Sequence, residues 1–331
     1  MRERDFIRSI EKRKQSANPL LEKGIGDDCA IFRTPPGDDW LVSTDMLVEG
    51  VHFDPQWHAP YLLGRKSLAV NLSDIAAMGG TPQLALLCLA LPGSCEESWT
   101  SAFMDGFFSL LVEHGCTLIG GDTVSSDQLT ISVTVMGTAP KEKAVCRNGA
   151  QAGDVVYVSG PLGSAAGGLY LLQNEVADLT SLMDDFPALV REHLNPSPQI
   201  VLGSILQKSG MLTAMQDISD GIATDLSHIA AASGVAAIIF EKDLPAHEQL
   251  LVMCKQLQLN PTTFQLRGGE DYQLLFTVKK GCGKQLEQLV EKESGIQVYR
   301  VGEIAQGEGV SLVKRSGATI DITYQGYEHR S

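Results

Sequence analysis

The residues best suited to chemistry in this sequence are aspartates that stand beside glycine or small hydroxyl residues. Taken singly, each is explained by the preference of Asp for turns and helix N-termini. As a set, separated by apolar segments that can bring their ends together, they suit several Mg²⁺ ions, which prefer carboxylate oxygens and keep water and phosphate as further ligands. Unpaired neighbouring carboxylates repel one another, so such a cluster requires cations. The five places are Asp27-Asp28, Asp45 after Ser43-Thr44, Asp74, Asp122 after Gly121, and Asp217 with Asp220.

The common motifs for phosphate binding and hydrolysis are missing from the sequence. It contains neither a P-loop nor the catalytic and metal-binding motifs of protein kinases. Gly24-Ile-Gly26 begins like a dinucleotide fingerprint, but Cys29 takes the place of the third glycine and two carboxylates would face the pyrophosphate. No zinc-binding histidine pair or nucleophilic serine elbow occurs. Metal-bridged phosphate chemistry is the class that remains.

Length, charge and hydrophobicity exclude other classes of protein. A chain of 331 residues is long enough for two α/β domains. Its 40 acidic and 26 basic residues give a formal net charge of −14, which disfavours nucleic acid as a partner. The longest apolar run, Leu84–Leu91, is far shorter than the roughly 20 residues of a membrane span, and it is expected to be a buried strand. The charged start Met1–Phe6 is unlike a secretory signal, so we expect a cytoplasmic protein with no membrane partner and reduced core cysteines.

The first 140 residues alternate strands and helices that would position the first aspartates. A strand over 40–44 is expected to end at Asp45, and a helix over 61–78 would place Asp74 near its C-terminal end. Further expected elements are strands over 83–91, 116–119 and 129–137, a helix from a capping box at Ser94 and Glu97 to Gly115, and a short helical face at Phe6, Ile7 and Ile10.

The rest of the chain again places carboxylates before a helix. Asp217-Ile-Ser-Asp-Gly221 directly precedes a predicted helix over 222–233. We therefore predict an α/β (α+β) chain with an N-terminal α/β domain over residues 1–140 and a C-terminal α+β domain over residues 141–331. The other elements expected in the second domain are strands over 155–159, 235–240, 272–278, 297–301 and 318–323, and helices after the glycines of 160–168, from the Asn195–Pro198 break to 209, and over 246–257 and 283–293.

Six ordered motifs give the chain a nearly end-to-end resemblance to one family. It resembles thiamine-monophosphate kinases, of the superfamily that includes aminoimidazole ribonucleotide synthetase and selenophosphate synthetase. The resemblance implies a two-domain PurM-like architecture with a mixed N-terminal sheet. It also implies ATP-dependent phosphorylation of thiamine monophosphate to thiamine diphosphate, the final step of thiamine diphosphate biosynthesis, by a homodimer that pairs its N-terminal domains. The motifs are Gly24–Ala30, Ser43–Phe53, Ala69–Asp74, Ile119–Asp122, Asp217–Gly221 and Gly268–Tyr272.

The same resemblance assigns roles to individual residues. Arg147 would offer paired hydrogen bonds to phosphate oxygens, Glu270 would accept from the aminopyrimidine, and Tyr324 would stack on the cationic heterocycle. The alternative interpretations are a solvated loop position for Arg147 and half-buried packing for Tyr324. The implied Mg²⁺ ligands or their neighbours are Asp27, Asp28, Ser43, Thr44, Asp45, Asp74, Asp122, Asp217 and Asp220; the ATP contacts are Gly121, Arg147 and Ser219; the acceptor contacts are His52, Glu270 and Tyr324.

The implied reaction needs neither a general base nor a covalent nucleophile. The second pKa of a phosphate monoester is about 6, so the acceptor oxygen is largely anionic at neutral pH, and direct in-line transfer is expected. Two alternatives stay open: another ATP-dependent activity of the superfamily, and a non-catalytic Mg²⁺-nucleotide-binding regulator. No cysteine precedes Cys29 and no lysine lies in Leu47–His52, which argues against two sister activities. His52 and Glu270 argue against a regulator without an acceptor pocket.

Overall fold

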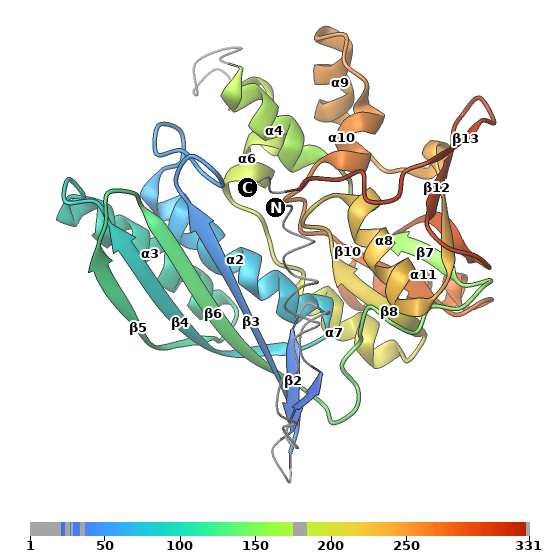
Figure 1. Cartoon of the computed structure of the whole chain (residues 1–331), viewed down its shortest axis with the longest axis horizontal. Coiled ribbons are helices and arrows are strands. Elements are labelled where there is room, and N and C mark those ends of the chain that lie inside the picture. Colours follow the sequence, from blue (N-terminus) through green and yellow to red (C-terminus); the bar gives the residue numbers. More distant parts are fainter. Residues whose placement is uncertain (1–20, 24–26, 28, 34–36, 175–183, 329–331) are drawn as a thin grey trace.

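The computed structural model describes residues 21–23, 27, 29–33, 37–174 and 184–328. The chain forms two β-sheets that lie side by side, with helix α2 between them at the back of the view in Figure 1. The expected helical face at Phe6, Ile7 and Ile10 falls outside the described residues. No helix among the described residues has the length and apolar character to cross a lipid bilayer.

The N-terminal sheet is mixed, with strand order β1-β2-β3-β6-β4-β5, because β4 and β5 run parallel while the other neighbours are antiparallel. Alternation in β6 buries Ile131, Val133 and Val135 on the face that α2 and α3 cover. The elements are β1 (Leu21–Lys23), β2 (Ala30–Arg33), β3 (Asp39–Val48), α2 (Pro60–Ala77), β4 (Thr81–Leu91), α3 (Glu97–Glu113), β5 (Thr117–Ser125) and β6 (Thr130–Ala139).

The two helices behind this sheet touch backbone to backbone at glycines. A Cβ at Gly64 would lie 2.0 Å from the Phe103 carbonyl oxygen, and one at Gly106 would lie 1.8 Å from the Tyr61 carbonyl oxygen. Any side chain at either position would force α2 and α3 apart. The aromatic rings of Phe103 and Phe107 are fully buried beside this contact and complete the core between the helices and the sheet.

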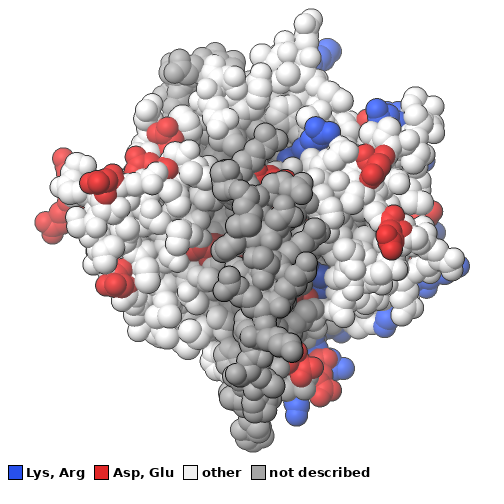
Figure 2. Space-filling view, viewed as in Figure 1, with Lys and Arg blue, Asp and Glu red and all other residues white. Residues whose placement is uncertain are grey.

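The opposite face of this sheet, here called the outer face, is covered by none of the helices that the structure describes. Strand alternation places Thr44 on β3, Leu86 on β4 and Val124 on β5 there, and the Val124 side chain is 52% exposed. In Figure 2 this part of the surface shows no Lys or Arg and few Asp or Glu side chains. Within the described part of the chain, a broad sheet face with few charged side chains therefore has no helix packed on it.

The C-terminal half surrounds a second mixed sheet with strand order β13-β12-β9-β11-β7-β10-β8, in which only β9 and β12 are parallel among the strands described. Helix α8 covers it through Ile222, Leu226 and Ile229. The elements are β7 (Val155–Val158), α4 (Ser164–Gln173), α6 (Pro187–Leu194), α7 (Ile200–Ser209), β8 (Leu212–Asp217), α8 (Ile222–Ser233), β9 (Ala236–Phe240), η1 (Glu241–Asp243), α9 (Glu248–Gln256), α10 (Pro261–Arg267), β10 (Leu274–Val278), α11 (Gly283–Ser294), β11 (Tyr299–Ala305), β12 (Val310–Val313) and β13 (Thr319–Asp321).

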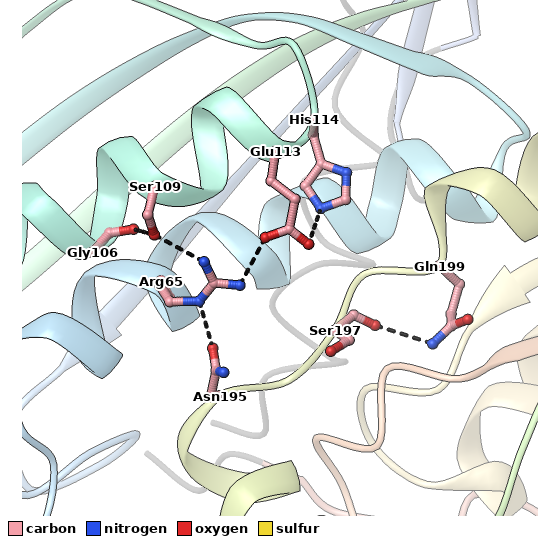
Figure 3. Close-up of polar contacts among 8 residues, drawn as sticks. All are labelled: Arg65, Gly106, Ser109, Glu113, His114, Asn195, Ser197 and Gln199. Atoms are coloured by element: carbon pink, nitrogen blue, oxygen red, sulfur yellow. Dashed lines mark hydrogen bonds and ion pairs between the residues drawn. The ribbon is translucent and has the colours of Figure 1, made fainter.

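Helix α2 joins the two halves through polar contacts at both of its ends. The Arg65 guanidinium donates to Asn195 Oδ1 at 2.9 Å, while its other nitrogens bond Ser109 and Glu113 of α3 (Figure 3). Near the other end of α2, the Ser73 hydroxyl donates to Asp217 Oδ2 at 2.6 Å. One side of α2 therefore belongs to the core of the first sheet and the other to the interface with the second half.

Several expected elements were wrong in extent. Strand β3 does not end at Asp45 but runs on to Val48, because Leu47 is buried and pairing with β6 continues to Thr130. Asp122 likewise lies within β5 and not in a loop, because pairing with β4 continues through both preceding glycines. These two aspartates are therefore mid-strand residues.

Other errors have equally local causes. The expected capping box fails because α3 begins at Glu97 after Glu96, and the Cys95 N–H bonds the Pro92 carbonyl in a turn before it. Strand β10 begins at Leu274, not at residue 272. All seven cysteines are free, but Cys88 is exposed and only Cys29, Cys116 and Cys254 are buried. The expectations missed β1, β2, β8, α6, α10 and β12, all of them short.

Candidate functional site

A cavity of about 690 Å³ lies where the two halves meet, and carboxylates line one side of it. Asp45 reaches it from the helix-covered face of β3, and Asp74 reaches it from the last turn of α2. Asp217 ends β8, and Asp220 stands just before α8. Both halves thus contribute aspartates to one space.

Hydrogen bonds from neighbouring residues fix the direction of these carboxylates. Ser43 donates its hydroxyl to Asp74, so the residue two before Asp45 on the same face of β3 orients an aspartate of α2. Asn71 Oδ1 accepts from the Asp45 backbone N–H at 3.0 Å. Ser73, next to Asp74 on α2, holds Asp217. The cluster is therefore built before any cation arrives.

The electrostatics of the cluster fit a cation. Burial raises the pKa of Asp217 to about 6 against the opposing hydrogen bond from Ser73, and the Asp45 charge adds to the rise. Behind Asp220, burial and then the Asp220 charge raise the pKa of Asp225 well above its usual value. Carboxylates that raise one another's pKa against the opposing Arg147 charge carry excess negative charge, and their oxygens are the ligands Mg²⁺ prefers. The residues present therefore fit Mg²⁺.

A second group of polar residues lines the same cavity. His52 accepts the Val48 backbone N–H at Nδ1 (3.1 Å), so the proton of the neutral ring lies on Nε2. Glu270 has a positive φ of 65°, and its backbone N–H donates to the Ser219 carbonyl at 2.8 Å. Left-handed backbone in a non-glycine residue is uncommon and concentrates at functional sites. The loop 268–272 is thus held in one shape beside the carboxylate cluster.

Comparison with known proteins gives one consistent answer over the whole chain. The family model for AIR synthase related protein, N-terminal domain, matches residues 26–139, and the model for its C-terminal domain matches residues 151–315. The thiamine-monophosphate kinase of Salmonella typhimurium is 38% identical over 318 residues, covering 96% of this chain and 94% of that protein. The thiamine-monophosphate kinase of Bacillus subtilis is 35% identical over 337 residues, covering 99% of each.

A solved structure described as AaThiL complexed with AMPPCP and TMP matches with a TM-score of 0.86 and 34% identity, over 99% of this chain and 97% of that one. The chain belongs to the thiamine-monophosphate kinase family. Membership of this family confirms the resemblance drawn from the six motifs. The two matched domains confirm the two-domain PurM-like fold.

The cavity of this thiamine-monophosphate kinase family member collects about half of the residues expected at the site. Ser43 reaches it indirectly through its bond to Asp74, and Asp28 lies outside the described residues. Tyr324 instead packs its ring against His228, with ring centroids 5.3 Å apart, and Tyr327 is the tyrosine near the C-terminus that lines the cavity. The expected residues that line the cavity are Asp45, His52, Asp74, Asp217, Ser219, Asp220 and Glu270.

Two expected metal residues lie on the other face of the N-terminal sheet. Thr44 bonds Thr134 Oγ1 there at 2.9 Å, and Asp122 pairs in register with the exposed Cys88. Asp45 and Gly121 occupy one row of the sheet but are separated by three strand spacings, about 14 Å. Within one chain, Asp122 and Asp45 therefore cannot share a metal ion.

Arg147 and Asp27 lie beside each other near the cluster but outside the cavity lining. The Arg147 backbone N–H donates to Asp27 Oδ2 at 3.1 Å, and Arg147 Nε lies 3.9 Å from Asp27 Oδ1. The Arg147 charge opposes the rise that burial causes in the pKa of Asp217. Its guanidinium is thus close enough to the carboxylates to attract an anion bound beside them.

Sequence reasoning missed five residues around the cavity. Asp225 and His228 stand three residues apart on α8, and a ligand atom from each lies within 4.8 Å of one from Asp220. Their spacing on a helix was the one available signal. Lys66, His193 and Tyr327 carry no local signal, because each reaches the cavity region only through tertiary packing.

Proposed function

We propose that this chain transfers the γ-phosphate of ATP to thiamine monophosphate and so forms thiamine diphosphate. The observation that carries the proposal is a single cavity lined by aspartates from both halves of the chain together with His52 and Glu270. Membership of the thiamine-monophosphate kinase family supports it, as does the likeness to a structure complexed with AMPPCP and TMP. Phosphate chemistry and recognition of an organic acceptor would meet in this cavity.

Asp45, Asp74, Asp217 and Asp220 would hold the metal ions. Bound Mg²⁺ supplies neutralisation of the charge that gathers when two phosphates approach each other. Ser43 and Ser73 keep the aspartates aimed at that space. We propose no general base, because the acceptor oxygen is largely anionic at neutral pH.

The remaining assignments follow from where each residue lies. Ser219 and Arg147 are proposed to contact ATP, with Arg147 bonding its phosphates. His52 and Glu270 are proposed to contact the acceptor, and Tyr327 is better placed than Tyr324 to cover it. The domain boundary is proposed near residue 140. A cytoplasmic location is proposed because ATP is the phosphate donor.

Release of ADP should depend on both the acceptor and the metal. With Mg²⁺ and ATP present, we expect thiamine monophosphate to raise ADP release at least about tenfold over the rate without acceptor, with one thiamine diphosphate formed per ADP. Thiamine, which lacks the phosphate, and excess chelator are the controls, and neither mixture should release ADP above background. Coupled spectrophotometry and chromatography of the products measure both quantities. Equal ADP release with and without thiamine monophosphate would refute the proposed acceptor and favour a sister activity or a regulator.

We propose further that two copies pair through the outer face of the N-terminal sheet. None of the described helices covers this face, which bears few charged side chains and holds residues such as Leu86 and Val124. Large exposed apolar surfaces mark interaction sites, and most homo-oligomers are two-fold dimers. Thr44 and Asp122 lie on this face. A role for Asp122 in the reaction therefore depends on the second copy.

A charge on the outer face should dissociate the dimer. Val124→Asp places an unpaired carboxylate in the pairing face of each copy, so we expect dimerisation to weaken by about 100-fold or more. Val112→Asp is the matched control, since Val112 is 81% exposed on α3 and lies on the other side of the sheet. Sedimentation velocity over a range of concentrations measures the change. A Val124→Asp variant as dimeric as the control would place the interface elsewhere.

A further inference from the structure

Lys66 is a lysine of α2 whose side chain is completely buried. Its ammonium Nζ lies 3.1 Å from Oε2 of Glu270, 204 residues further along the chain. A buried ammonium is costly unless it is paired and hydrogen-bonded, so a lysine kept at this position indicates a specific partner. That partner is the glutamate proposed to contact the acceptor.

His193, at the end of α6, lies against the same oxygen of Glu270. Its Nδ1 is 3.0 Å from Glu270 Oε2, and the ring is only 2% exposed. Burial, and then the Lys66 charge, lowers the pKa of His193 below its usual value. The ring is therefore neutral at physiological pH. With its proton on Nδ1, the neutral ring would present an N–H donor to the carboxylate.

Glu270 itself stays ionised in this setting. Burial is the largest influence and would raise the pKa of its carboxyl, but the Lys66 ammonium and the His193 ring together outweigh it and hold the pKa well below its usual range. Its side chain is 23% exposed and lines the cavity. Since Oε2 is engaged by Lys66 and His193, Oε1 is the oxygen left to face a ligand.

We propose that Lys66 and His193 are positioning residues that hold Oε2 of Glu270 and so present Oε1 to a neutral N–H donor of the acceptor. The inference rests on the proposed function, in which the aminopyrimidine supplies that donor. Because Lys66 already balances the Glu270 charge, a cationic ligand group would gain little attraction at Oε1. Glu270 therefore recognises the acceptor by the direction of its N–H donor, which must approach Oε1 of a carboxylate whose orientation is fixed.

A double-mutant cycle tests whether Lys66 acts through Glu270. Calorimetry with Mg²⁺ and a nonhydrolysable ATP analogue would give the Kd for thiamine monophosphate in the wild type, Lys66→Met, Glu270→Gln and the double variant. We expect each single change to weaken binding about tenfold or more. In the Glu270→Gln background, adding Lys66→Met should change the Kd by less than about twofold. The ATP analogue should bind all four proteins within about twofold of one another.

The outcomes separate this inference from the proposed function. No binding of thiamine monophosphate by the wild type would refute the proposed function. Binding by the wild type with additive effects in the cycle would refute the positioning role alone. Lys66→Met leaves Glu270 without its counter-charge, and Glu270→Gln leaves the buried Lys66 ammonium without its own, so circular dichroism of both single variants accompanies the cycle. The double variant removes both charges together and serves as the folded reference. A Glu270→Gln Kd that differs from that of the double variant by more than about twofold would refute the positioning role.

Rescue by a shape-matched amide tests His193. The side-chain N–H of asparagine lies close to where histidine carries Nδ1, so His193→Asn keeps a donor toward Glu270 and His193→Ala does not. We expect His193→Asn to bind thiamine monophosphate within about threefold of wild type and His193→Ala to bind about tenfold more weakly. The KM for the acceptor should change in the same order, with kcat nearly constant. Equal losses in the two variants would leave His193 only a packing role.

Discussion

Asp45→Asn lowers kcat by about 100-fold or more at saturating Mg²⁺ while the protein stays folded: this is the largest change in rate that we expect. The variant keeps the shape of the side chain in the middle of β3 and removes one charge from the cluster. Electrostatic stabilisation of the transferring group by bound cations is the main source of acceleration in such a reaction, so losing a metal-holding carboxylate costs several kcal/mol. Steady-state kinetics with circular dichroism measure both parts of the prediction.

The metal-free stability of the same variant gives an independent check. The Asp45 charge contributes to the raised pKa of Asp217, so the carboxylates repel one another without cations. Asp45→Asn should therefore melt no lower than the wild type in chelator, and it should gain less from added Mg²⁺. Asp105→Asn, at an exposed position of α3, is the control and should leave both quantities unchanged. Wild-type turnover by Asp45→Asn would remove this residue from the metal site.

The largest change in stability is expected at the contact of α2 with α3. Gly106→Ala would put a Cβ 1.8 Å from the Tyr61 carbonyl oxygen, and a backbone atom of a packed helix cannot move aside alone. The helices must separate, which opens the core beside Phe103 and Phe107. We expect the free energy of unfolding to fall by about 3 kcal/mol or more, a large share of the stability of a typical protein.

Urea unfolding followed by circular dichroism would measure this loss. Gly93→Ala is the matched control, because a Cβ at Gly93 meets nothing within 4 Å and its φ is not in the left-handed region. Its midpoint should stay close to that of the wild type. A Gly106→Ala midpoint that matches the control would mean that the helices do not pack as closely as described.

The sequence predicted the elements whose pattern repeats over many residues. The helix over 222–233 was predicted with the bounds that the structure gives it, and the strand predicted over 129–137 closely matches β6, because each keeps its own periodicity without interruption. Asp45 and Asp122 were expected at strand ends, since Asp and Gly usually mark turns. In this fold, pairing along the whole strand overrides that preference.

Site residues that belong to sequence motifs could be predicted, whereas those that reach the site only through tertiary packing could not. His52 and Glu270 were expected, and the structure places them in one cavity. Lys66 follows Arg65 in a predicted helix, where a lysine is ordinarily exposed to solvent, and only the fold brings Glu270 against it. The same holds for Tyr327, three residues beyond the tyrosine that was expected. The local sequence pattern does not indicate which distant residues will come into contact in this way.

Helix α2 also bears on whether the chain can be cut into working pieces. Its residues Arg65, Lys66 and Ser73 bond Asn195, Glu270 and Asp217, all of which lie in the other half of the chain. A fragment that ends near residue 140 would keep α2 but lose all three partners, and Lys66 would face solvent beside exposed core residues such as Ala76. The two segments that the family models match are therefore not expected to fold independently of each other. Separately expressed halves are expected to recover structure only when mixed, because each half supplies the packing surface and hydrogen-bond partners that the other lacks.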